Sequence, residues 1–199
     1  MIGLLLLSAI FLLNASHSSV YAQIESRRVN LTYLSQRADV IEQGKITKVE
    51  HEPMPGAPNI PTVKVTISVQ DMVRGPAAST TYTLREVDLN SRQKNLKRTY
   101  AAGANMFLFL TAPSKFGNSA PVAIEQGRFH IQRHPSGTYM IANECGNVGL
   151  FKDIESSAKK AGKSLTRAQS QLAATKQGPV ELDGFVSLVK NLTLLPRIK

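Results

Sequence analysis

Two histidines stand four residues apart in the stretch GRFHIQRHPSGTYM, and histidine is the side chain best suited to bind a metal or move a proton near neutral pH. On a helix, His130 and His134 would share one face. The apolar residues at 129 and 131 alternate with polar ones, however, which predicts a strand. On a strand the two Cα atoms lie roughly 13 Å apart, too far for both rings to bind one ion unless the chain bends. We therefore expect a hairpin arm with a solvated outer face, and keep His130 and His134 only as candidate metal ligands.

The single cysteine, Cys145, is the other residue that could do chemistry. One thiol cannot form an internal disulfide, so the fold must be held by burial. The residue fits a small buried position, a nucleophile that would need a histidine beside it, or an intermolecular disulfide. The chain has no glycine-rich phosphate loop, no zinc spacing of cysteines and no nucleophile elbow. We therefore assign no catalytic residue and no cofactor, and expect a protein that is not an enzyme.

Charge is the strongest compositional signal, with 24 basic against 14 acidic residues and a net charge of +10. This balance favours anionic partners such as nucleic acid, acidic polysaccharide or a phosphate-rich envelope surface. Nucleic acid is disfavoured because aromatic residues do not alternate with the basic ones. The candidate ligand-binding residues are Arg92, Lys94, Lys97 and Arg98, together with the proline-rich loop before Pro61. The competing interpretation is a solvated basic loop.

The first 22 residues are typical of a secretory signal peptide. Residues 2–13 form an apolar run too short to span a bilayer comfortably, and Val20-Tyr21-Ala22 predicts cleavage after Ala22. No later segment is apolar enough to cross a membrane, so we expect a secreted or periplasmic protein. Because no Lys or Arg precedes the apolar run, an uncleaved membrane anchor is the alternative.

The elements that position these residues are mostly short strands. Val63, Val65, Ile67 and Val69 alternate with polar residues, which predicts a strand with one dry face. The other expected strands are 40–49 with a bulge at Gly44, 80–87, the wholly apolar 106–110, and the hairpin arms 128–134 and 138–144.

Short helices are expected at both ends of the strand region. Asn30 is a plausible cap for a helix carrying Leu31 and Leu34. Residues 152–178 read as a basic linker or a weak helix, because their helical stripe is mostly alanine. In 179–199, Asp183 caps a docking helix whose apolar stripe comprises Phe185, Leu188, Val189 and Leu192.

Ala38-Asp39, Gly44 and Ile46, followed by the alternating strand 63–75 and the strand 103–110, form a pattern over about residues 35–151. It resembles a group of exported bacterial proteins of unassigned function, and is similar to netrin-like and metalloproteinase-inhibitor-like domains, which are oligonucleotide/oligosaccharide-binding (OB) type barrels. The resemblance implies a fold rather than an activity, because those inhibitors act through an N-terminal cysteine that this chain lacks.

We therefore expect a mainly β protein: an OB-like antiparallel barrel of five to six strands over residues 23–151, with peripheral short helices. The expected function is an exported, non-enzymatic binding module for an anionic polysaccharide or an envelope component. The alternatives are a hydrolase using Cys145 or the two histidines, and a membrane-anchored envelope structural protein.

Overall fold

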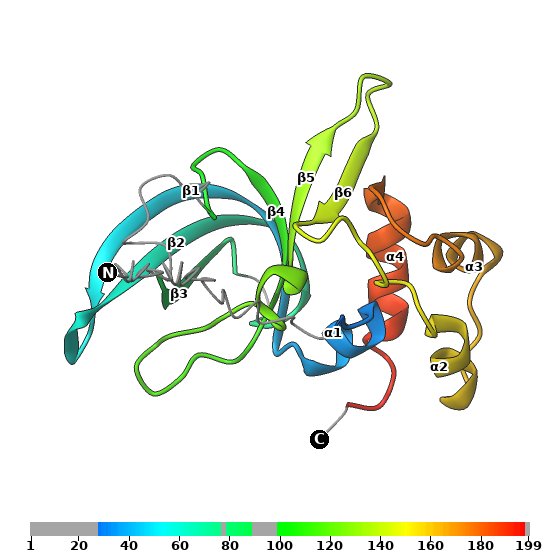
Figure 1. The fold of residues 1–199 in the computed structure, drawn as a ribbon, viewed down its shortest axis with the longest axis horizontal. Helices are drawn as coiled ribbons and strands as arrows, with labels where there is room; N and C mark the ends of the chain where they lie inside the picture. Colours follow the sequence, from blue (N-terminus) through cyan, green and yellow to red (C-terminus); the bar gives the residue numbers. More distant parts are fainter. Residues whose placement is uncertain (1–27, 77–78, 89–98, 198–199) are drawn as a thin grey trace, which may run out of the picture.

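The computed structural model describes residues 28–76, 79–88 and 99–197, which form one curved antiparallel sheet with short helices beside it (Figure 1). The strands are β1 (Val40–Met54), β2 (Ala57–Arg74), β3 (Thr81–Val87), β4 (Asn105–Leu110), β5 (Arg128–Arg133), β6 (Tyr139–Asn143) and β7 (Val180–Glu181). The helices are α1 (Leu31–Arg37), the 3-10 turn η1 (Ile124–Gly127), α2 (Ile154–Lys160), α3 (Arg167–Ala173) and α4 (Leu182–Leu192). The strand order in the sheet is β3-β2-β1-β4-β5-β6-β7.

The long β1–β2 hairpin confirms the alternating pattern of the sequence for Val63, Val65 and Ile67, which are buried, whereas Val69 is only half-buried. The prediction of a proline-rich loop before Pro61 was wrong, because β1 continues to Met54 and β2 already begins at Ala57. Pro53 lies opposite Pro61, beyond the last residues that pair with β4 or β3. Proline lacks an N–H donor, and this is tolerated at the sheet margin, where no second neighbouring strand needs that donor.

The bulge predicted at Gly44 is present as a register shift between Gln43 and Gly44. A Cβ atom on Gly44 would lie 2.4 Å from Cγ2 of Ile67 and 2.5 Å from the carbonyl oxygen of Ser68. Only glycine lets β1 and β2 approach so closely at this bend.

The sheet has a hydrophobic core on each face. The inner core lies within its curvature and comprises Val40, Ile46, Val63, Val65, Ile67, Leu84, Tyr100, Met106, Leu108 and Leu110. The helix-side core lies between the other face and the helices and includes Phe107, Phe109, Phe129, Ile141, Phe185, Leu188 and Val189. Strand β4 contributes alternate residues to both cores, which confirms the prediction that it is buried on both sides.

The protein is mainly β, as predicted, but the barrel expected over five to six strands is not closed. The seven-stranded sheet of the described residues ends at β3 and β7. A loop prevents backbone closure between β3 and β5: the Ser119 N–H donates to the carbonyl of Arg85 on β3 (2.8 Å), and Leu110 bridges to Pro121. The carbonyl of Arg85 therefore bonds to the loop and not to another strand.

The C-terminal part of the chain covers the helix-side core. Figure 1 shows α4 alongside β5 and β6, with α3 and α2 outside it. The four residues of the predicted stripe are buried there, as expected. The cap differs from the prediction, because Glu181 occupies the N-cap and Asp183 lies in the first turn. The stretch 152–178, expected to be a basic linker or a weak helix, contains two short helices, and a capping box between Thr166 and Gln169 begins the second.

Candidate functional site

The basic residues that we predicted to bind a ligand, Arg92, Lys94, Lys97 and Arg98, lie outside the described residues. Their role therefore stays a prediction. The other predicted positions, His130, His134 and Cys145, are all described, and the two histidines line one groove.

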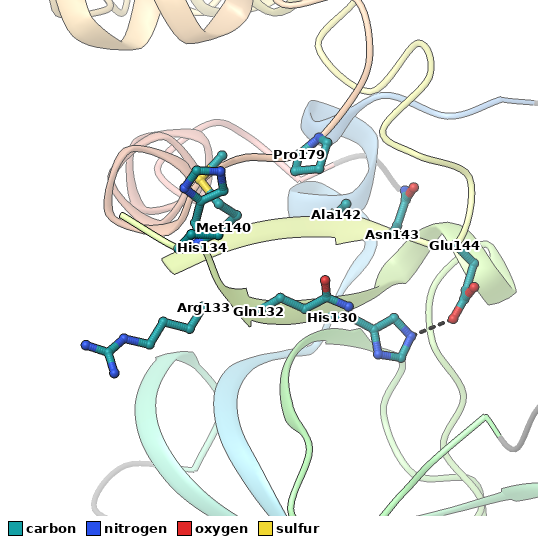
Figure 2. Close-up of a pocket in the computed structure, with 10 residues that line it drawn as sticks. His130, Gln132, Arg133, His134, Met140, Ala142, Asn143, Glu144 and Pro179 are labelled. Carbon is teal, nitrogen blue, oxygen red and sulfur yellow. Dashed lines mark hydrogen bonds and ion pairs between the residues drawn. The ribbon is translucent and has the colours of Figure 1, made fainter. Parts of the chain in front are cut away.

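This groove has a volume of about 600 Å³ and lies over the β5–β6 hairpin (Figure 2). Its residues are His130, Gln132, Arg133, His134, Pro135, Met140, Ala142, Asn143, Glu144 and Pro179. Such a volume is within the usual range for small-molecule sites. Most of the polar side chains can donate hydrogen bonds, and Glu144 is the single carboxylate among the lining residues.

The groove continues the face of the sheet that carries the inner core. His130 lies opposite Met106 of β4 and Ala142 of β6, and Met106 belongs to the inner core. Side chains on a strand alternate between faces, so Gln132 lies on the same side as His130, and His134 follows directly after the end of β5. Phe129 and Ile131, which flank His130 in the sequence, belong to the helix-side core on the opposite face. This confirms the predicted hairpin and its polar row, and places that row in a groove.

The two histidines lie at opposite ends of the row (Figure 2). His130 Nε2 lies 2.6 Å from Glu144 Oε1, and His134 Nδ1 lies 2.9 Å from the hydroxyl of Ser136. Within 28–76, 79–88 and 99–197, no group of three or more His, Cys, Asp or Glu side chains is arranged to hold a metal ion. The structure therefore separates the two candidate ligands and gives each a different partner.

A buried asparagine pair fixes the turn that carries Glu144. The Asn143 N–H donates to Oδ1 of Asn147 (3.0 Å), and the Asn147 N–H donates to Oδ1 of Asn143 (2.9 Å). Asn147 also donates from Nδ2 to the carbonyls of Ile141 and Gly178 (3.1 and 2.9 Å) and has a positive φ of 57°. Asparagine tolerates this left-handed conformation better than most residues.

Cys145 lies in the same turn, where its backbone N–H donates to Oδ1 of Asn143 (3.1 Å). The residue is half-buried and does not line the groove. The structure therefore does not bring this thiol together with His130 and His134 in one site.

Arg128, at the start of β5, joins this strand to β3, which is distant from it in the sheet. Its Nη2 donates to both carboxylate oxygens of Glu86 on β3 (3.0 and 3.2 Å), and its Nη1 donates to Glu125 (3.1 Å). Tyr100 donates to Glu86 (3.0 Å) and accepts from Nε of Arg128 (3.2 Å). Four interstrand spacings separate β3 from β5, about 19 Å in a flat sheet. The ion pair therefore depends on the strong curvature of the sheet, and it connects the two margins of the inner core.

Burial raises the pKa of Glu86 above its ordinary value, and the charge of Arg128 opposes this rise. The side chain of Arg128 is only 3% exposed and is held by two carboxylates, so the network is a buried structural contact, inaccessible to a ligand. Sequence reasoning missed it because Glu86 and Arg128 are 42 residues apart.

Glu42 is a second buried acid that sequence reasoning missed. It lies on β1 opposite Met72 of β2 and Leu108 of β4, is fully buried, and has no hydrogen-bond partner for either carboxyl oxygen within the described residues. Burial raises the pKa of Glu42 from 4.5 to about 8. Its carboxyl group is therefore protonated and neutral at pH 7.

The chain matches no protein-family model and no curated protein. The netrin-like resemblance therefore stays a prediction, and function is inferred from the geometry of the groove. Of the helices in the described part of the chain, none has the length and apolar character needed to cross a membrane.

Proposed function

We propose that this protein is an exported, non-enzymatic binding module that recognises a short segment of an acidic polysaccharide in the groove over β5 and β6. The observation that carries the proposal is the excess of donors in the groove. Arg133 is exposed and has no ion-pair partner within the described residues, while His130, Gln132 and His134 add further donors. The only lining carboxylate, Glu144, is already paired with His130.

The neutral part of the groove suits a sugar better than a nucleobase. Met140, Ala142 and Pro179 supply small apolar contacts, and the amides of Gln132 and Asn143 are partners for hydroxyl groups. No Phe, Tyr or Trp of the described residues lines the groove, so the large aromatic platform on which single-stranded nucleic-acid binders stack bases is missing there. The net charge of +10 adds a long-range attraction for any polyanion.

The strand order supports an OB-type assignment as part of this proposal. The run β3-β2-β1-β4-β5 curls around the inner core, and the loop and the Arg128–Glu86 pair fill its open side. OB folds are partly open five-stranded barrels whose faces and loops bind oligosaccharides and oligonucleotides. Export remains inferred from residues 1–22. A mature N-terminus at Gln23, measured by mass spectrometry of exported protein, would support it, and retention of residues 1–22 would favour the membrane anchor.

Binding is tested by titrating the purified protein with polygalacturonate, heparin and single-stranded DNA over a salt series. We expect the acidic polysaccharides to bind, with affinity falling as salt screens the charges. Arg133→Gln should weaken binding about 1.4- to fivefold, the range for an exposed charge pair. Arg167→Gln on α3 removes the same charge from an exposed position outside the groove and is the matched control. Absence of binding to every polymer, or equal losses in the two variants, would refute the assignment.

The His130–Glu144 pair favours one second candidate, a hydrolase in which this pair activates a water molecule. The ten lining residues include no Ser, Thr, Cys or Lys to act as a nucleophile. Incubation with polygalacturonate and with chromogenic esters would detect such an activity. Turnover that is abolished by Glu144→Gln would favour the enzyme over the binding module.

A further inference from the structure

One carboxylate already sits in a groove whose other polar groups are mainly donors. Glu144 Oε1 lies 2.6 Å from Nε2 of His130, within hydrogen-bond distance, and the contact is an ion pair when the imidazole is protonated. This contact shows that the groove accommodates a carboxylate at His130. Glu144 therefore stands where the acidic group of a ligand would make the same contact.

We propose that Glu144 is an internal competitor, and that the ligand is a uronic-acid oligosaccharide whose carboxylate replaces that of Glu144 on His130. The inference rests on the proposed function, because it concerns the same groove. It adds the chemical class of the ligand and a residue that limits its affinity.

The two partners differ in how firmly they are held. His130 is part of the β-ladder between Met106 and Ala142, and its side chain is 26% exposed. Glu144 is an exposed residue of the turn that follows β6, and its side chain is 37% exposed. A glutamate that rotates away from His130 enters water, where its charge is well solvated. The imidazole thus stays in place while the carboxylate exchanges.

The competition from Glu144 can weaken ligand binding only modestly. An exposed ion pair is formed about 1.4 to 5 times as often as it is broken. A ligand that binds only when the pair is broken therefore has a dissociation constant larger by a factor of one plus this ratio. Removing the charge of Glu144 should therefore raise the affinity for a uronate about two- to sixfold. It should leave the affinity for the uncharged ester of the same sugar nearly unchanged.

The experiment measures dissociation constants by calorimetry for trigalacturonate and its methyl ester with the purified protein and three variants. Glu144→Gln removes the competitor and keeps the side-chain shape. Glu181→Gln is the matched control, because Glu181 is exposed on β7 opposite Met140 but does not line the groove. The third variant combines Glu144→Gln with His130→Gln and is compared with His130→Gln alone.

We expect Glu144→Gln to bind trigalacturonate about two- to sixfold more tightly, Glu181→Gln to change the affinity less, and the gain to vanish in the His130→Gln background. Trigalacturonate, and not its ester, should also shift the imidazole resonances of His130 in the unmodified protein, a readout that needs no variant. Equal affinities of the original protein and Glu144→Gln would overturn the competition while the binding module stands. An equal gain in Glu181→Gln would also overturn it, since loss of charge alone would explain the effect. Binding of single-stranded DNA but not trigalacturonate would overturn the ligand class, and no binding to any polyanion would overturn the proposed function itself.

Discussion

Replacing Glu42 with glutamine should remove one component of the pH dependence of folding stability. Glu42 is fully buried on β1 between Met72 and Leu108, and neither carboxyl oxygen has a partner within the described residues. Burial therefore favours the neutral form and raises the pKa of Glu42 to about 8. Burial raises the pKa of Tyr82 on β3 as well, and the charge of Glu42 adds to this rise, so Tyr82 stays uncharged at neutral pH.

The sign and size follow from proton linkage. The folded state holds the Glu42 proton up to about pH 8, whereas the unfolded chain loses it near the ordinary value of 4.5. The contribution of the Glu42 proton to the free energy of unfolding is fully present below pH 4.5. It is lost as the pH rises towards 8, with a slope of about 1.4 kcal/mol per pH unit. The whole contribution is about 4–5 kcal/mol. This is a large fraction of the roughly 5–15 kcal/mol that stabilises a typical domain.

The assay is urea unfolding of the original protein and of Glu42→Gln at pH 5, 6, 7 and 8, followed by circular dichroism. Other titrating groups, Glu86 included, are common to both proteins, so the difference between the two free energies of unfolding isolates Glu42. We expect this difference to change by about 1.4 kcal/mol per pH unit, with the original protein losing stability relative to the variant as the pH rises. A constant difference between the free energies of unfolding of the two proteins from pH 5 to 8 would refute the burial of a neutral carboxyl group.

Three further substitutions test the fold around the groove. Arg128→Met should destabilise the protein by about 3–5 kcal/mol, because Glu86 is left buried without its partner, and adding Glu86→Leu should recover part of that loss in urea unfolding. Asn147→Ala should reduce the free energy of unfolding by about 2–4 kcal/mol, because it removes three side-chain hydrogen bonds from a buried turn. Gly44→Ala should lower the melting temperature by several degrees, because the new methyl group would overlap the backbone oxygen of Ser68.

Each of these predictions has a result that contradicts it. If the double variant at 128 and 86 is no more stable than Arg128→Met, the pair does not connect the margins of the inner core. If Asn147→Ala unfolds at the same urea concentration as the original protein, the asparagine pair does not hold the turn. An unchanged melting temperature for Gly44→Ala would show that β1 and β2 can separate at the bulge without loss of stability.

The sequence by itself determined the local structure, because strand and helix periodicities depend on neighbouring residues. The alternation through Val63, Val65 and Ile67, the bulge at Gly44 and the stripe on α4 were all predictable for this reason. The hairpin was also predictable, and with it the separation of His130 from His134. The extended structure of the proline-rich ends of β1 and β2 was not predictable, because a proline is tolerated only where no neighbouring strand needs a backbone N–H donor at that position.

Only the tertiary structure decided which distant side chains meet. The pairing of Arg128 with Glu86 depends on the curvature of the sheet, and the pairing of His130 with Glu144 depends on the turn built by the asparagine pair. Glu42 follows Val40 at a spacing of two, which places both on one face, but its complete burial depends on the strands on either side and on the curvature of the sheet. Register and curvature are set by contacts between residues far apart in the chain. A local pattern therefore predicts the row of side chains in the groove but not the partner that each one contacts.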